Sequence, residues 1–119
     1  MDLRWVFVCC GLFATSYGQE NFTRADSLQG SLRFERTNYD VLRYDLNISV
    51  NPVQKTIQGY NEIRFNVVEN TNKIQLDLFE NMKVDSIIWN THVLNYIREF
   101  DAVFVSFPET LTKNSIQTL

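Results

Sequence analysis

Hydrophobic and polar residues alternate along most of the chain after residue 38. The clearest example is the segment 39–50, in which apolar and polar side chains take strict turns: Leu42, Tyr44, Leu46, Ile48 and Val50 against Arg43, Asp45, Asn47 and Ser49. A repeat of two places successive side chains on opposite faces of a strand and does not fit a helix. The segment therefore predicts a strand with one face buried and one face in water.

The same pattern predicts further strands, separated by short turn-forming segments. They are 56–68, 74–79, 82–89, 92–97 and 102–107, with the start of a seventh at 115–119. Proline fixes φ and has no N–H, so Pro52 predicts the turn of a hairpin and Pro108 predicts the end of the sixth strand. Gly59 predicts a bulge or a close approach of the backbone, and Asn90-Thr91 a tight turn.

No helical pattern separates these strands, which favours an antiparallel sandwich or barrel over a βαβ fold. We expect an all-β antiparallel sandwich over 39–119 that is incomplete at its C-terminus, after an extended polar leader over 19–38. An incomplete sandwich exposes its inner face and an unpaired sheet edge. The residues expected on that face are Phe65, Val67, Val105 and Phe107, and self-association through the exposed sheet edge follows.

The first residues have the form of a secretory signal peptide. A short charged start precedes the apolar run 5–14, and Ser16 and Gly18 supply small residues before Gln19. The apolar run is well below the roughly 20 residues that span a bilayer, so a membrane anchor is not expected. The sequence predicts a signal peptide over 1–18, cleavage before Gln19 and a secreted or periplasmic protein.

Composition excludes several kinds of function. The 119 residues carry 11 Lys and Arg against 14 Asp and Glu, and the net charge of −3 argues against nucleic acid as a partner. Cys9 and Cys10 both lie in the predicted signal peptide, which leaves no thiol for catalysis or metal binding. The single histidine, His92, cannot by itself build a zinc site or a serine–histidine catalytic set.

Few residues remain as candidates for chemistry. His92 beside the predicted turn is interpreted as an ordinary strand residue. Two carboxylate pairs, Asp45 with Asp77 and Glu80 with Asp85, are conceivable for acid–base catalysis, but each residue falls on a polar strand face or in a turn. We assign no catalytic, cofactor-binding or metal-binding residue to this chain. The triplets 21–23 and 47–49 match the N-glycosylation sequon, which matters only in a eukaryotic secretory route.

Aromatic residues suggest a binding surface as an alternative. Seven of them are candidates for a platform that holds a sugar or a peptide: Tyr39, Tyr44, Tyr60, Trp89, Tyr96, Phe100 and Phe104. Aromatic residues also favour strands and fill sandwich cores, which is the interpretation we prefer. Tyr60 and Phe104 fall on predicted polar faces and are the two expected to be exposed.

Several segments together resemble the opening of secreted bacterial aminopeptidase N-type proteins, which belong to the family of zinc aminopeptidases that includes leukotriene A-four hydrolase. The resemblance covers 23–112, and the segments that carry it are Thr23–Gly30, Glu35–Thr37, Tyr39–Leu46, Ile57–Gly59, Ile63–Phe65, Ile74–Leu78 and Lys83–Ile87. It implies the N-terminal β-sandwich domain, which in that family packs beside the catalytic domain and helps to wall the active-site cleft.

The family's catalytic motifs are missing from this sequence. Its zinc is held by a helical His-Glu-x-x-His with a later glutamate, and a Gly-x-Met-Glu-Asn strand binds the substrate amine; neither motif occurs here. The resemblance thus implies a chain that is itself inactive and holds no cofactor, with zinc in a separate catalytic metallopeptidase domain as its partner. Two other interpretations stay open: a stand-alone secreted sandwich that binds a glycan, peptide or partner chain, and a module that assembles by strand addition.

Overall fold

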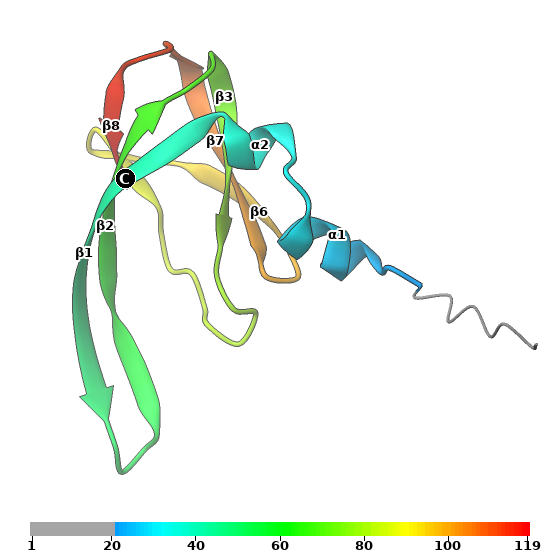
Figure 1. The fold of residues 1–119 in the computed structure, drawn as a ribbon. Helices are drawn as coiled ribbons and strands as arrows, with labels where there is room; N and C mark the ends of the chain where they lie inside the picture. Colours follow the sequence, from blue (N-terminus) through cyan, green and yellow to red (C-terminus); the bar gives the residue numbers. More distant parts are fainter. Residues whose placement is uncertain (1–20) are drawn as a thin grey trace, which may run out of the picture.

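The computed structural model describes residues 21–119. The predicted signal peptide, residues 1–18, lies outside the described residues. In chain order the elements are α1 (Arg24–Gly30), α2 (Phe34–Thr37), β1 (Tyr39–Asn51), β2 (Thr56–Val67), β3 (Thr71–Asp77), β4 (Ile88–Trp89), β5 (His92–Val93), β6 (Asn95–Glu99), β7 (Ala102–Leu111) and β8 (Ile116–Thr118) (Figure 1).

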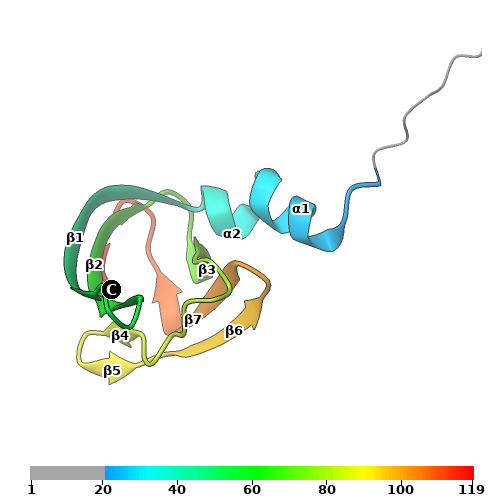
Figure 2. The same ribbon diagram turned by 90° about the horizontal axis from the view of Figure 1, so that it is seen from below.

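The strands form two antiparallel layers. One sheet has the order β1-β2-β8 and the other β3-β7-β6, while β4 and β5 make a separate two-stranded hairpin (Figures 1 and 2). All the pairings are antiparallel. The prediction of an all-β antiparallel sandwich is confirmed.

The core lies between the facing sides of the two sheets. Phe65 and Val67 from β2 pack with Ile74 from β3 and Val105 from β7, and all four have no exposed surface. The rings of Phe65 and Phe107 lie 6.5 Å apart between centroids. Phe65, Val67, Val105 and Phe107 therefore form the centre of the sandwich, and the expectation that they lie on an exposed face is wrong. The strands present in the chain already close this part of the core.

The strands β1 and β2 form the predicted hairpin. Their register runs from Tyr39 opposite Val67 to Asn51 opposite Thr56, with a shift between Val41 and Arg43. The turn contains Pro52 and is closed by Asn51, whose Oδ1 accepts the backbone N–H groups of Val53 and Gln54 at 3.1 and 3.0 Å. The outer half of the hairpin extends away from both sheets' common core (Figure 1).

Residues 24–30 and 34–37 are helical, so the expectation of an extended leader over 19–38 is wrong for these residues. Thr23 begins α1 with a capping box, in which its side chain accepts the Asp26 N–H and the Asp26 carboxylate accepts the Thr23 N–H. Leu28 then packs on Ala102 and Phe104, on the outer side of β7. Arg24 also pairs with Glu99 of β6 at 2.8 Å. Burial of Leu28 gives this short helix the tertiary support that its length alone does not provide.

Several strand boundaries differ from the sequence prediction, and the strand expected at 74–79 is β3, Thr71–Asp77. Only Ile88–Trp89 of the expected strand 82–89 is paired, and the expected strand 92–97 divides into β5 and β6. β7 continues past Pro108 to Leu111, because residues 107–110 have no partner in the ladder and the missing proline N–H costs no hydrogen bond there. The predicted tight turn at Asn90-Thr91 does join β4 to β5, with φ of 46° and 67°.

The last strand, β8, joins the sheet of the hairpin. The strand expected at 115–119 is β8, which pairs with β2 so that Phe65 faces Gln117. Gln117 also accepts a hydrogen bond from Nε1 of Trp89 at 3.0 Å, which ties β8 to the core. Neither helix of the described segment, residues 21–119, has the length and apolar character needed to cross a bilayer.

Candidate docking surface

The residues considered for chemistry do not assemble into a site. His92 is exposed, and its Nδ1 lies 2.8 Å from the carbonyl oxygen of Asn90 in the β4–β5 turn. Over residues 21–119, no three His, Cys, Asp or Glu side chains lie where they could hold a metal ion together.

Of the two candidate carboxylate pairs, three members (Asp45, Asp77 and Asp85) each form an ion pair with a nearby cation. Asp45 pairs with Arg43 at 2.6 Å on one side of β1, whereas Asp77 pairs with Arg36 at 2.8 Å at the end of β3. Asp85 pairs with Lys83 at 3.1 Å on an irregular loop.

The aromatic residues likewise divide between the core and different surfaces. Tyr39 and Trp89 belong to the core, where they make edge-on contacts with Phe65 and Phe107 at 5.5 and 5.4 Å. Tyr60 is exposed, as expected. Phe104 is only 8% exposed, so its predicted exposure is wrong. The helix α1 covers it, and periodicity within the strand carries no signal for a helix that packs on the outer face.

A row of exposed apolar side chains lies on the outer half of the β1–β2 hairpin. Alternation and register place on one side of it five apolar residues, here called the distal face: Tyr44, Leu46, Ile48, Val50 and Ile57. Tyr44 stands opposite Ile63, and Val50 stands opposite Ile57. Ile63 belongs to the core, so the distal face continues the core-facing side of the sheet beyond the point where the second sheet covers it.

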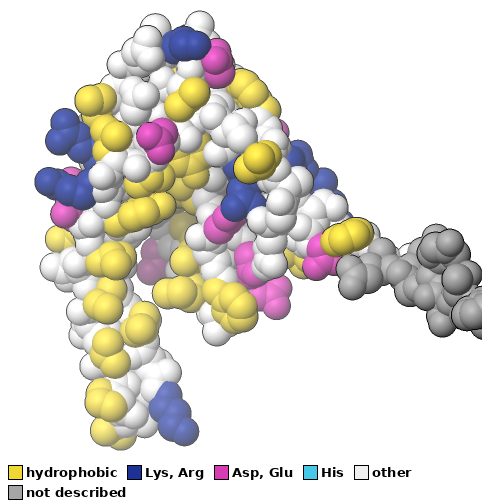
Figure 3. All heavy atoms as spheres, in the orientation of Figure 1, with side chains coloured by type: hydrophobic (Ala, Val, Ile, Leu, Met, Phe, Trp, Pro, Cys, Tyr) yellow, Lys and Arg dark blue, Asp and Glu magenta, His cyan; other side chains and the backbone are white. Residues whose placement is uncertain are grey.

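The exposure of this face is high. Leu46 is 68% exposed, Ile48 57% and Val50 59%. Figure 3 shows hydrophobic side chains following the projecting hairpin toward its tip. Large contiguous apolar surfaces on folded proteins are typical of protein or membrane interaction sites and of ligand-binding grooves.

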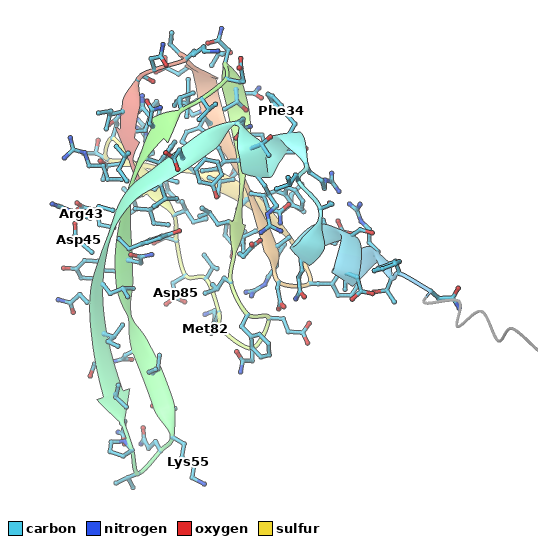
Figure 4. All side chains as sticks on the ribbon, in the orientation of Figure 1. Phe34, Arg43, Asp45, Lys55, Met82 and Asp85 are labelled. Atoms are coloured by element: carbon cyan, nitrogen blue, oxygen red, sulfur yellow. The ribbon has the colours of Figure 1, made fainter. Side chains whose placement is uncertain are left out.

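The hairpin's charged side chains lie on the opposite side. Asp45 stands opposite Glu62 in the register, one position out of phase with the distal face, and Arg43 stands opposite Arg64. Figure 4 shows Arg43 and Asp45 on the side of β1 that points away from the rest of the molecule, and Lys55 at the hairpin tip. The hairpin is therefore amphipathic, and its distal face carries no charge.

A groove lies at the base of the distal face. It has a volume of about 410 Å³ and is lined by Arg36, Tyr39, Asp40, Val41, Tyr44, Asn61, Ile63, Leu76 and Asp77. The Oη atom of Tyr39 donates a hydrogen bond to the carbonyl oxygen of Gln75 at 2.6 Å. Burial of this phenol raises the pKa of Tyr39 to about 12, so it stays neutral. Arg36 is engaged by Asp77 and by the carbonyl oxygen of Leu28.

An irregular loop, residues 78–87, follows β3, and Met82 and Asp85 on it are labelled in Figure 4. Arg98 of β6 fixes this loop, because its guanidinium donates to the carbonyl oxygens of Leu78 and Phe79 at 2.7 Å each and to that of Met82 at 2.5 Å. These side-chain donors replace the strand ladder that the sequence predicted there.

Comparisons with protein-family models, with curated proteins and with solved structures found no match for this chain. The arrangement itself is suited to contact with another protein. It offers an uncharged apolar face and a small groove with neutral Tyr39.

Proposed function

We propose that the chain is the non-catalytic N-terminal β-sandwich portion of an aminopeptidase N-like zinc metallopeptidase, whose parent activity is removal of N-terminal residues from peptides. Its role is to support a separate catalytic domain, which supplies the zinc and the chemistry. The observation that carries the proposal is the uncovered apolar distal face, because such a face has no use in an isolated solvated sandwich and fits a module that packs against other protein.

Two further observations support this proposal. The fold is an antiparallel sandwich, as the resemblance over residues 23–112 implies for an N-terminal domain. Three of the four carboxylates considered for acid–base catalysis, Asp45, Asp77 and Asp85, lie in local ion pairs, which suits a scaffold better than an acid–base catalyst. Secretion or export to the periplasm is part of the same proposal and is supported by the pattern of residues 1–18.

The test is association with a catalytic domain. The full chain is co-expressed with the zinc-binding domain of a secreted bacterial aminopeptidase N-type protein that has been deprived of its own N-terminal domain. We expect the two to co-purify and the hydrolysis of aminoacyl chromogenic substrates to rise above that of the catalytic domain alone. Failure to co-purify, together with unchanged hydrolysis, would contradict the proposal.

The chain alone provides a second test. With added zinc, we expect no hydrolysis of the same substrates, because a catalytic zinc needs three protein ligands and water activation needs a positioned base. Turnover by the chain alone that disappears with a chelator and with His92→Ala would show that it is itself an enzyme. Mass spectrometry of the exported protein tests the location, with an N-terminus at Gln19 as the expected result.

A further inference from the structure

The distal face has properties that determine what kind of surface can cover it. Among its five side chains there is no charge, and each residue named in it is at least half exposed. The face is also flanked by open backbone. β1 is 13 residues long and pairs only with β2, while β2 meets β8 only near its end, at residues 64–66. The described chain therefore leaves the outer half of the hairpin without a neighbour on either edge.

The sequence features that normally keep an exposed strand from pairing with another chain are absent from the distal face. Exposed strands are usually blunted by charged residues that point inward, by proline or by bulges. Here the irregularity in register falls near the base of β1, between Val41 and Arg43, and no proline occurs within β1 or β2. The charges of Arg43, Asp45 and Glu62 all lie on the outer side.

We propose that a second copy of this chain covers the distal face. The two hairpins pack face to face about a two-fold axis, so that each apolar row meets its own counterpart. This inference concerns the chain by itself: a catalytic domain of the kind proposed above would compete with the second copy for the same face. An isologous contact needs a patch that is complementary to itself. An uncharged, flat, apolar row meets that condition, since no like charges oppose each other across the axis.

The area available is close to what a specific dimer requires. Five half-exposed side chains of roughly 100 Å² each offer about 500 Å² per copy, or about 1,000 Å² in a dimer, against the 1,200–2,000 Å² of typical stable interfaces. An interface slightly below that range gives a weak dimer that dissociates on dilution. Pairing of the open strand edges would add hydrogen bonds to the same interface, although face-to-face packing alone accounts for the apolar pattern.

The experiment compares matched lysine substitutions on the two sides of the same strands. Ile48→Lys and Ile57→Lys place a charge in the distal face, whereas Asn47→Lys and Gln58→Lys place the same charge on the opposite side. The full chain and the four variants are examined by sedimentation equilibrium over a wide concentration range. Reducing buffer keeps Cys9 and Cys10 as thiols. Thermal unfolding checks that the variants stay folded, which we expect because none of the four residues belongs to the core.

The proposal requires a monomer–dimer equilibrium for the wild-type chain and for the two outer-side variants. It also requires at least a tenfold weaker dimer for both inner-side variants. A wild-type chain that stays monomeric at all concentrations would overturn it, and so would equal association of all five proteins. If only the β1 variants weaken the dimer, edge pairing replaces the face-to-face arrangement. If the wild-type chain is monomeric and a separate catalytic domain protects the distal face, the occupant is that domain and not a second copy.

Discussion

The two halves of the β1–β2 hairpin use the same alternating pattern and have opposite surroundings. Near the base, Phe65 and Val67 of β2 are completely buried, and Ile63 beside them is 9% exposed. Toward the tip, Ile57 on the same side of the same strand is 53% exposed. The change occurs where the sheet β3-β7-β6 ends and leaves the hairpin uncovered (Figure 1).

This difference shows that the alternation of apolar and polar residues is a property of one strand, whereas burial depends on what packs against that strand. The base contributes to stability through the core, and the tip contributes little until another surface covers it. The tip is therefore the part of the hairpin that is free to serve binding. The predictions below test this division of roles.

The largest expected effect separates two isoleucines that lie on the same face of β2. Ile63→Ala removes a buried side chain and should reduce the free energy of unfolding by about 2–4 kcal/mol. Ile57→Ala, at the exposed end, should cost less than about 1 kcal/mol, mostly from strand propensity. Urea unfolding of both variants at a concentration where the chain is monomeric gives the comparison. Equal losses would mean that the two halves do not differ in their contribution to the core.

The second prediction uses a glycine that holds the two strands of the tip close together. A Cβ atom at Gly59 would lie 2.0 Å from the carbonyl oxygen of Asn47, so Gly59→Ala must displace the backbone of the hairpin. We expect a loss of about 2 kcal/mol and faster amide exchange in residues 46–58, with β3 and β7 still protected. Gly30→Ala is the matched control, because nothing lies within 4 Å of the added atom. An equal rise in amide exchange across both sheets would contradict the expectation that the hairpin tip opens without the core.

The third prediction concerns the loop 78–87, which lies outside the hairpin and is held by β6. Arg98→Lys keeps the charge but cannot reach the carbonyl oxygens of Leu78, Phe79 and Met82 together, so we expect a loss of about 1.5 kcal/mol. Limited proteolysis should cleave the variant within 78–87 before any other site. Arg43→Lys, on the exposed ion pair with Asp45, is the control and should behave like the wild-type chain.

The smallest effect is expected at Tyr39, at the base of the hairpin. Tyr39→Phe removes the hydrogen bond to Gln75 and should cost about 1 kcal/mol at neutral pH. Because burial raises the pKa of Tyr39 to about 12, the neutral phenol stabilises the folded state below pH 10, and this contribution is lost as the pH rises toward 12. The wild-type chain should thus lose stability over that window more steeply than Tyr39→Phe. A parallel pH dependence in the two proteins would show that Tyr39 does not titrate as described, and Tyr60→Phe serves as the exposed control.

Local pattern was a reliable guide to the hairpin and a poor one to the segments held by distant side chains. The strand pair β1–β2, the turn at Pro52 and the close approach at Gly59 were predictable because neighbouring residues determine them. The loop 78–87 was not, since its course depends on Arg98 and Tyr96 from β6, whose side chains donate to its carbonyl oxygens. The helix α1 carried one overlooked signal, the capping pair Thr23 and Asp26, but its docking depends on Leu28 reaching Phe104.

The candidate surface divides in the same way. The sequence alone determined that Leu46, Ile48 and Val50 share one side of a strand, because alternation needs no knowledge of the rest of the molecule. It also determined that His92 has no second histidine to work with. Only the tertiary structure decided which apolar faces are covered. It placed Phe65, Val67, Val105 and Phe107 inside and left the distal face outside, because burial depends on where the second sheet ends and not on the composition of either strand.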